Sequence, residues 1–254
     1  LAGGTGGHVY PALSVAKEFK KNEFTIFWIG KKDSLESKLS KAESFNFISL
    51  DTKGFKGKSI FGKIISLIYL EINFLKSIFI IKKIKPDVVF STGGYVTLAP
   101  ALASYLLSIP IFIHEQNSIP GLVNRILNRL SKLTFEAFPD SFNKSSKIHT
   151  VGNPVRSGII KNPTTEAKKK EHFNILILGG SQGSKQLNEI VLKTFGEKVI
   201  PSNWRIVHQI GDLDKSSVVD VYSKQSFSYE VVSYIEDIGK AYHESDLVIG
   251  RSGA

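Results

Sequence analysis

A dense cluster of glycines stands near the amino end of the chain, in the stretch GGTGGHVYPALSVAKEF that begins at Gly3. Glycine loses more conformational freedom on folding than any other residue, so such a cluster needs a specific reason. Without side chains, a ligand can reach the backbone N–H groups themselves. His8 follows the cluster directly, and an imidazole titrates near neutral pH. These residues indicate an oxyanion site with a proton acceptor beside it.

Two further glycine loops follow apolar runs, TGG at Thr92–Gly94 and GGSQG at Gly179–Gly183. A strand that ends in glycines and leads into a helix directs free N–H groups and the positive end of the helix dipole at one point, which suits a phosphate. The common nucleotide fingerprints fail, because Val9 stands where G-x-G-x-x-G needs glycine and neither GGTGG nor GGSQG is followed by a Walker lysine. A dehydrogenase or P-loop kinase is thereby disfavoured. The alternative is that these are ordinary tight turns.

Apolar runs rich in β-branched and aromatic residues alternate with longer helical patterns, which is typical of βαβ units and a parallel sheet. PALSVAKEFKK and PGLVNRILNRLSK have apolar residues at helical spacing, and each begins with a proline suited to a first helical turn. In open α/β sheets ligands bind at the carboxyl ends of strands, where the glycine loops are expected. The strands predicted in this part are FTIFWIG, FNFISLD, DVVFSTGG, PIFIHEQN, LTFEAF and KIHTVGNP.

A polar, lysine-rich stretch, KNPTTEAKKKEH at residues 161–172, interrupts this pattern and is interpreted as a linker. After it, FNILILGGSQGSKQLNEIVLKTF repeats the opening order of glycine loop and helix, and strands WRIVHQIG, YEVVSYI and DLVIGRSG follow. We therefore expect two α/β domains, residues 1–160 and 161–254. The chain opens on a glycine loop without Met and stops in a loop. We expect a piece that lacks its start, with an incomplete second domain.

Composition narrows the class of protein. Lys and Arg total 33 against 23 acidic residues, a net charge of +10, which suggests nucleic acid, phospholipid or a phosphorylated substrate as partner, or else a general compositional bias. The chain has no cysteine, which excludes disulfides and thiolate metal sites. No secretory signal is visible, and charged residues interrupt the apolar stretch at 59–84 before it reaches the roughly 18 to 20 residues that span a bilayer. A cytoplasmic protein is expected.

Seven blocks carry a more specific signal, in order along the chain: GGTGGHVYPALSVA, STGGYVTLAP, IHEQNSIPGLVN, VGNPVR, LGGSQGSKQLN, YIEDIGKAY and GRSGA. They resemble the MurG family of bacterial N-acetylglucosaminyltransferases, which convert lipid I to lipid II in peptidoglycan synthesis. The resemblance implies an α/β protein of the GT-B fold, with two Rossmann-like domains whose parallel sheets face a cleft. It implies UDP-GlcNAc as donor, undecaprenyl-linked lipid I as acceptor, and no cofactor.

The resemblance also assigns residues. It implies that the amino-terminal domain faces the acceptor and that the carboxyl-terminal domain holds most of the donor. Ser181 matches a donor-diphosphate contact and Ile235 a uracil contact. The full set of matched donor contacts is Thr5, Gly6, Gly7, Asn117, Arg156, Ser181 and Ile235, and the matched acceptor-side loop is Gly93, Gly94 and Tyr95. Family residues beyond GRSGA, an acidic ribose partner and glutamines near the sugar, are not in this chain, so we expect it to be inactive by itself.

Inverting glycosyl transfer needs a base for the acceptor hydroxyl and stabilisation of the leaving diphosphate. His8 is the candidate base, and the alternative is a residue that only orders its loop. His114 and Glu115 are the next candidates, although Glu115 could equally orient a neighbour. Asn117 could instead shape a turn, and Arg156 could be a plain surface charge. The sequence DLD at 212–214 fits a solvated loop better than a metal site, so no metal is expected.

Eight lysines and one glutamate occur between Lys53 and Lys85, interleaved with IFGKIISLIYLEINFLKSIFII. A basic amphipathic surface of this kind can lie on anionic lipid, so we expect peripheral attachment to the inner face of the plasma membrane. A helix pair with a solvated lysine face is the alternative. Two other functions stay open: another GT-B enzyme that uses UDP-GlcNAc, such as a 2-epimerase or glycolipid synthase, and a basic nucleic-acid-binding protein. The aromatic RNA-binding motifs are missing, so no nucleic acid partner is expected.

Overall fold

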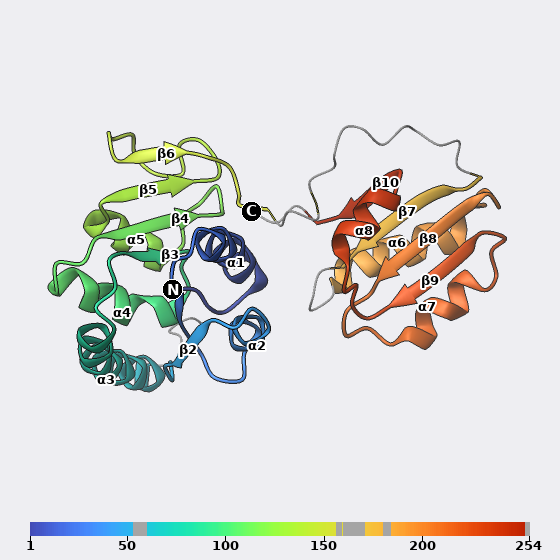
Figure 1. Ribbon diagram of the computed structural model, residues 1–254. Helices are drawn as coiled ribbons and strands as arrows, with labels where there is room; N and C mark the ends of the chain where they lie inside the picture. The colour runs from blue at the N-terminus through green and yellow to red at the C-terminus, as the bar shows by residue number, and fades with distance from the viewer. Residues whose placement is uncertain (53–59, 156–158, 160–170, 180–183, 252–254) are drawn as a thin grey trace. The chain divides into compact units, whose positions relative to one another are not determined.

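The computed structural model describes residues 1–52, 60–155, 159, 171–179 and 184–251 of the chain. Contacts divide the chain into two compact units, Leu1–Val155 (unit 1) and Arg156–Gly253 (unit 2), each an α/β body (Figure 1). The boundary predicted between residues 160 and 161, and most of the predicted linker, lie outside the described residues. No helix in the described ranges has both the length and the apolar character needed to cross a membrane.

Unit 1 contains two sets of parallel strands, a four-stranded sheet in the order β3-β4-β5-β6 and the pair β1-β2. The first residues of the chain lie along β3, because the Leu1 nitrogen donates to the Phe90 carbonyl at 2.7 Å and Thr92 N–H donates to the Leu1 carbonyl at 3.2 Å. All six strands expected in this part are present. They are β1 (Phe27–Gly30), β2 (Asn46–Ser49), β3 (Val89–Ser91), β4 (Ile111–Glu115), β5 (Leu133–Glu136) and β6 (Ile148–Thr150).

The helices of unit 1 differ from the prediction at their starts. α1 already begins within the glycine loop, at Gly6, so Pro11 lies inside the helix and not in its first turn. Pro120 lies outside α5, whose N-cap is Gly121. The expectation that each proline opens a helix was therefore wrong, because the loops that precede the helices set their starts. The helices are α1 (Gly6–Lys21), α2 (Leu35–Ala42), α3 (Ile60–Ile84), α4 (Tyr95–Leu106) and α5 (Leu122–Leu130).

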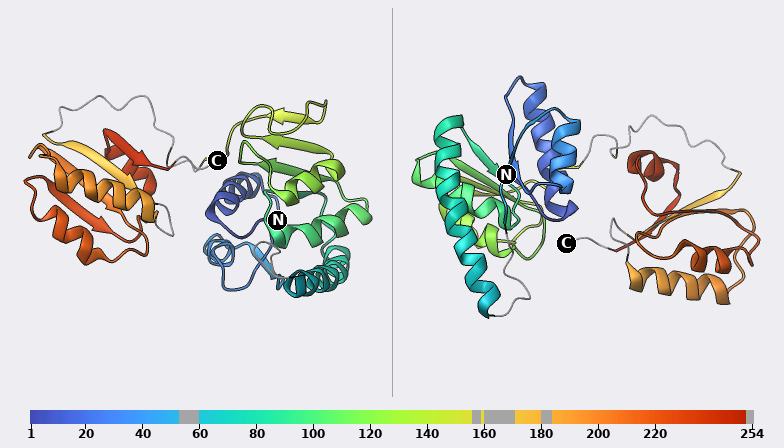
Figure 2. Two further views of the ribbon diagram at one scale, coloured as in Figure 1. Left: turned by 180° about the vertical axis from the view of Figure 1, so that it is seen from behind. Right: turned by 90° about the horizontal axis from the view of Figure 1, so that it is seen from below.

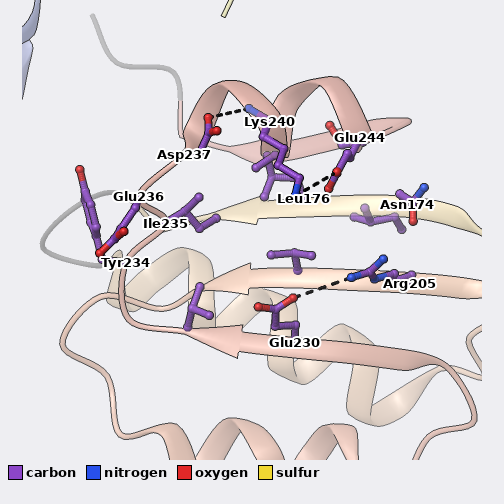
Figure 3. A pocket seen from close by; sticks show the side chains of 15 residues that line it. Asn174, Leu176, Arg205, Glu230, Tyr234, Ile235, Glu236, Asp237, Lys240 and Glu244 are labelled. Carbon is purple, nitrogen blue, oxygen red and sulfur yellow. Dashed lines mark hydrogen bonds and ion pairs between the residues drawn. The ribbon is translucent and has the colours of Figure 1, made fainter. Parts of the chain in front are cut away.

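Unit 2 contains one parallel sheet in the order β10-β7-β8-β9. α6 and α7 cover one face, where Ile177, Phe195, Ile206 and Tyr222 belong to one buried cluster, and α8 lies over the other face near β7 (Figure 3). Its elements are β7 (Phe173–Leu178), α6 (Lys185–Glu197), β8 (Trp204–Gln209), α7 (Lys215–Tyr222), β9 (Ser228–Val232), α8 (Ile238–Glu244) and β10 (Leu247–Gly250). Each unit is thus a Rossmann-like set of parallel strands and helices, as predicted.

Candidate active site

The first two glycine loops meet in unit 1, at the carboxyl end of β3. A Cβ on Gly94 would lie 2.2 Å from the carbonyl oxygen of Gly3, so the two backbones touch only because Gly94 has no side chain. Gly94 also has a φ of +97°, which L side chains rarely adopt. Thr92 Oγ1 donates to the His8 carbonyl at 2.8 Å and joins the loops a second time. The structure therefore brings the predicted loop residues around His8 together.

The glycines of the first loop are required for two different reasons. A Cβ on Gly3 would lie 2.5 Å from Val96 and 2.7 Å from the Glu36 carboxylate, so close packing against protein explains this glycine. By contrast, no described residue other than its chain neighbours comes within 4 Å of a Cβ placed on Gly4, whose φ is +101°, and a Cβ on Gly7 would make an ordinary van der Waals contact with Thr5 Oγ1 at 3.6 Å. Open space is thus available at Gly4, where the positive φ also favours glycine, whereas Gly3 and Gly94 serve the packing of the protein itself.

The amino end of α1 is open to an anion. Thr5 is its N-cap residue, but the Thr5 side chain makes no capping hydrogen bond, and the first turn contains no acidic residue. The first N–H groups of a helix have no intrahelical partner, and the dipole places positive charge there. Gly6 and Gly7 supply these N–H groups next to His8. This end of the helix offers donors and positive potential to a diphosphate.

The second loop leads into α4 in a similar way. Gly93 also has a φ of +97°, and a Cβ there would lie 3.1 Å from Asn124 Oδ1. That oxygen is buried and has no hydrogen-bond partner among the described residues. Tyr95 is the first residue of α4 and packs, partly buried, against the apolar core of unit 1. The glycines of this loop therefore follow from its conformation and from the close approach of Asn124.

Glu115 is fully buried and accepts hydrogen bonds on both carboxylate oxygens. Oε1 accepts from Asn117 N–H at 3.0 Å and from Asn117 Nδ2 at 2.8 Å. Oε2 accepts from Gly121 N–H at 3.0 Å and from Asn124 Nδ2 at 2.9 Å. With four donors already on the carboxylate, Glu115 anchors the loop between β4 and α5 and is poorly placed to accept a substrate proton. The Asn117 amide nitrogen is committed to this carboxylate, which leaves its Oδ1 for other contacts.

His8 is one end of a chain of side-chain hydrogen bonds that extends into unit 1. Its Nδ1 lies 2.8 Å from Gln116 Oε1. Gln116 Nε2 lies 3.0 Å from His114 Nδ1 and 2.8 Å from the His114 carbonyl. His114 Nε2 lies 2.9 Å from the Gly152 carbonyl. We call this series, Gly152–His114–Gln116–His8, the unit 1 chain.

The two histidines of the unit 1 chain differ in exposure. His114 and Gln116 are buried, whereas the His8 side chain is half-exposed. Burial lowers the pKa of His114, and the hydrogen bond to Gly152 and the charge of Glu115 only partly oppose this. His114 is therefore neutral at physiological pH and has no access to a substrate. Between the predicted candidates, the geometry favours His8 over both His114 and Glu115 as a base.

The structure describes only some of the residues predicted to contact UDP-GlcNAc in unit 2. Arg156 and Ser181 lie outside the described residues. Ser184 is the N-cap of α6, and its hydroxyl accepts from Leu187 N–H at 3.3 Å. Ile235 is held after β9 by its N–H, which donates to Gln209 Oε1 at 3.0 Å.

Ile235 also lines a pocket of about 530 Å³ on the face of the unit 2 sheet that bears α8 (Figure 3). Figure 3 shows Ile235 beside the carboxyl ends of the strands, the edge at which open α/β sheets bind ligands. The wall carries two ion pairs, Arg205 with Glu230 at 3.9 Å and Lys240 with Glu244 at 3.7 Å. Because these pairs are exposed, they contribute little to stability.

The DLD sequence has a local structural role. Asp214 is the N-cap of α7, with Oδ1 accepting from Ser216 N–H at 3.2 Å. Among the described residues, no group of three or more His, Asp or Glu side chains is arranged to hold a metal ion.

The sequence analysis missed Gln116 and Asn124, which link the predicted residues to one another. Gln116 belongs to the same HEQN block as His114, Glu115 and Asn117, and its position next to two candidate residues was the available signal. Its partner His8, however, stands 108 positions earlier in the chain. Such a contact is invisible to local patterns.

The sequence matches the glycosyltransferase family 28 N-terminal domain over residues 1–135 and the glycosyltransferase family 28 C-terminal domain over residues 174–254. A Coxiella burnetii protein is 37% identical over 257 residues, which cover 100% of this chain and 72% of the relative. Its name is UDP-N-acetylglucosamine–N-acetylmuramyl-(pentapeptide) pyrophosphoryl-undecaprenol N-acetylglucosamine transferase. The chain belongs to the MurG family.

Solved structures agree with this family and with the predicted GT-B fold class. The crystal structure of Acinetobacter baumannii MurG matches with a TM-score of 0.76 and 32% identity, over 99% of this chain and 72% of that one. A Neisseria meningitidis UDP-GlcNAc 2-epimerase bound to UDP-GlcNAc matches with a TM-score of 0.65 but only 15% identity, over 99% of this chain and 76% of that one. The likeness to the epimerase shows a shared fold alone. MurG proteins and the epimerase alternative thus share an architecture, and sequence identity separates them.

Proposed function

We propose that this protein transfers GlcNAc from UDP-GlcNAc to lipid I and so forms lipid II in peptidoglycan synthesis. The alignment of the whole chain with a relative named for this reaction carries the assignment. In an inverting transfer the acceptor hydroxyl attacks the anomeric carbon, where a new C–O bond forms, and the bond from that carbon to the diphosphate of UDP breaks. The hydroxyl proton passes to a base, and the diphosphate leaves with its negative charge stabilised.

His8 is the base in this proposal. Its side chain is half-exposed at the open amino end of α1, while one ring nitrogen is already held by Gln116. Imidazole is suited to accept a proton near neutral pH. The other candidates in the motif are less accessible, because His114 and Glu115 are buried and fully hydrogen-bonded.

Backbone N–H groups and the α1 dipole stabilise diphosphate charge in this proposal, through Thr5, Gly6 and Gly7. The open space at the neighbouring Gly4 and the uncapped amino end of α1 support this role. We assign acceptor binding to unit 1 and most donor binding to unit 2, with no metal or other cofactor. The donor contacts proposed elsewhere are Asn117, Arg156, Ser181 and Ile235, and the acceptor-side loop is Gly93, Gly94 and Tyr95.

The test is the initial rate of GlcNAc transfer from UDP-GlcNAc to a lipid I analogue, measured for the 254-residue chain and for the protein extended to the length of its relatives. General-base catalysis typically contributes about 10²- to 10⁴-fold, so His8→Ala should lower the rate by that factor. His149→Ala, a change at an exposed histidine of unit 1, is the control. Undiminished transfer by His8→Ala would exclude the base role, and turnover of UDP-GlcNAc to its 2-epimer without acceptor would favour the epimerase.

We further propose that α3 rests on an anionic membrane surface, which places the protein at the cytoplasmic face of the plasma membrane. α3 buries several polar side chains, Ser66, Asn73 and Ser77, together with the apolar Ile81, whereas Phe79 is 75% exposed. α3 packs beside α4 at the edge of unit 1 (Figure 2). A large exposed apolar face is typical of surfaces that meet a membrane or a partner. Its exposed apolar residues are Ile65, Leu67, Ile68, Ile72, Leu75 and Phe79.

Vesicle co-sedimentation tests the membrane proposal. Vesicles with phosphatidylglycerol should retain the protein better than neutral ones, because exposed Lys76, Lys82 and Lys83 accompany the apolar face. Phe79→Ser should weaken binding, and Val199→Ser, at a 97% exposed apolar residue of unit 2, should not. If both variants lost vesicle binding equally, or if random RNA displaced the protein from the vesicles, the basic charge would serve a different partner.

A further inference from the structure

We propose that Gln116 is a positioning residue that fixes the tautomer of His8, so that Nδ1 carries the proton and Nε2 presents its lone pair to the substrate. This inference rests on the proposed function only for its catalytic meaning. The tautomer itself follows from the hydrogen-bond partners along the unit 1 chain, read from its buried end outward.

The orientation of the Gln116 amide is set by a backbone carbonyl. The amide atom 2.8 Å from the His114 carbonyl must be the nitrogen, because a carbonyl oxygen can only accept. The same nitrogen lies 3.0 Å from His114 Nδ1, which therefore accepts its second proton. The amide oxygen is then the atom that faces His8.

The tautomer of His114 gives an independent check. Its Nε2 lies 2.9 Å from the Gly152 carbonyl, so Nε2 must carry a proton. Burial lowers the pKa of His114, so the ring is neutral at physiological pH and Nδ1 is an acceptor. An acceptor at His114 Nδ1 requires a donor on Gln116. Two carbonyls, those of His114 and Gly152, thus set the Gln116 amide in the same orientation.

His8 is the last ring in this series. Its Nδ1 lies 2.8 Å from Gln116 Oε1, and an amide oxygen can only accept, so Nδ1 carries the proton. In the neutral imidazole Nε2 then has the lone pair. No described residue offers Nε2 a hydrogen bond, and the bond from Thr92 Oγ1 to the His8 carbonyl at 2.8 Å holds the backbone of His8 in place.

Gln116 therefore directs the ring of His8 without adding charge to it. When Nε2 takes a proton, the resulting imidazolium still donates from Nδ1 to a neutral amide oxygen. The titratable groups next to Gln116 in the sequence are His114 and Glu115. The carboxylate of Glu115 accepts hydrogen bonds from Asn117, Gly121 and Asn124. We expect loss of Gln116 to lower kcat and to leave the KM for UDP-GlcNAc unchanged, because both amide atoms of this buried side chain are already bonded to His8 and His114.

Ring ¹⁵N NMR of the 254-residue chain tests the tautomer directly, with the His8 signals assigned by their loss in His8→Ala. In the wild type we expect a protonated Nδ1 and an unprotonated Nε2. Gln116→Leu should shift both nitrogens toward a mixture of tautomers. His114→Asn, whose amide oxygen replaces the Nδ1 acceptor, should keep the wild-type His8 signals better than His114→Leu.

Activity supplies the second readout. For Gln116→Leu in the protein extended to the length of its relatives, we expect kcat to fall on the order of 10-fold, part of the whole general-base contribution. The melting temperature should also fall, because His114 Nδ1 loses its buried partner, so a wild-type circular dichroism spectrum and a cooperative transition above the assay temperature show that the variant is folded. A wild-type His8 protonated on Nε2, or His8 signals that Gln116→Leu leaves unmoved, would overturn the inference. Normal transfer by His8→Ala would overturn the proposed base role instead. The tautomer inference would still stand, because it is read from the His8 signals of the wild type.

Discussion

Both units contain a hydrogen-bonded chain that joins a backbone carbonyl, an amide side chain and a buried histidine, but the two chains end differently. In unit 2, Asn188 Nδ2 donates to the Ile210 carbonyl at 3.0 Å, and Asn188 Oδ1 lies 3.2 Å from His208 Nε2. His208 Nδ1 lies 2.8 Å from the hydroxyl of Tyr222. We call this series, Ile210–Asn188–His208–Tyr222, the unit 2 chain. The unit 1 chain ends at the half-exposed ring of His8.

The comparison shows that the last residue decides what such a chain does. Asn188, His208 and Tyr222 are all buried, so the unit 2 chain has no end that a substrate can reach. Burial lowers the pKa of His208 to about 4 and raises the pKa of Tyr222. Both groups are therefore neutral over a wide pH range and stabilise the packing of α6 and α7 on the sheet. The same amide–imidazole pairing serves stability in unit 2 and, in our proposal, chemistry in unit 1.

The largest effect on stability is expected at Glu115, which lies beside the unit 1 chain and, in our interpretation, anchors a loop and does not act in catalysis. Glu115→Ala removes a buried carboxylate and leaves four donors from Asn117, Gly121 and Asn124 without it. Loss of one partner of a buried charged network costs about 3–5 kcal/mol, so the free energy of unfolding should fall by that amount. Urea unfolding followed by circular dichroism measures it. Glu43→Ala, at a partly exposed ion pair with Lys17, should cost under about 1 kcal/mol. Similar losses in both variants would contradict the anchor role.

Breaking the unit 2 chain should reduce stability as well. Asn188→Leu leaves the Ile210 carbonyl and His208 Nε2 buried without partners. Each unsatisfied group costs about 1–3 kcal/mol, and the leucine recovers part of this by apolar burial, so we expect a loss of about 3 kcal/mol. Urea unfolding of unit 2, followed by Trp204 fluorescence in a Trp28→Phe background, is the measurement. Asn203→Leu is the exposed control, and an equal change there would show that the chain contributes nothing.

Acid should destabilise unit 2 through His208. Its folded pKa of about 4 lies below the ordinary histidine value of about 6.5, so the unfolded state binds more protons between these limits. Stability is therefore fully present above pH 6.5 and is lost as the pH falls toward 4. From pH 7 to pH 5 the loss should be about 2 kcal/mol. His208→Gln should flatten the pH dependence of Trp204-detected unfolding, and an unchanged slope would contradict the assignment.

The strands and the glycine loops could be predicted from the sequence because they are local patterns. β4 and β7, for example, are short apolar runs followed by a loop. The parallel sheets follow from the alternation of such strands with helices. The start of α1 could not be predicted, since Pro11 is a strong local signal for a first turn. The helix instead starts at Gly6, where contacts with the loop that follows β3 and with α4 set the backbone.

The roles of the candidate residues needed distant partners. Glu115 and His8 both looked like bases, and only the four donors on the first and the open ring of the second separate them. The unit 1 chain connects residues near positions 8, 115 and 152, which no sequence window contains. α3 was recognised as basic and apolar, but its exposed apolar face depends on which side packs against α4.

The smallest expected effect comes from the closed end of the unit 2 chain. Tyr222→Phe removes only the hydroxyl that His208 Nδ1 accepts from, and the ring keeps its edge contacts with Phe227 and Tyr229 at 5.3 and 5.5 Å. A net hydrogen bond contributes about 1 kcal/mol, so the loss on urea unfolding should be near that value. The acid sensitivity should persist, because burial and not the hydroxyl lowers the pKa of His208.

Tyr229→Phe, at a partly buried tyrosine of the same cluster, is the matched control and should change stability by less. If Tyr222→Phe cost as much as Asn188→Leu, the hydroxyl would orient the whole unit 2 chain. The orientation of His208 would then depend on Tyr222 as strongly as, in our inference, the tautomer of His8 depends on Gln116. The two chains would differ only in which end is exposed. A loss near 1 kcal/mol instead means that the Ile210 carbonyl, acting through Asn188, fixes His208, and that the tyrosine only completes it.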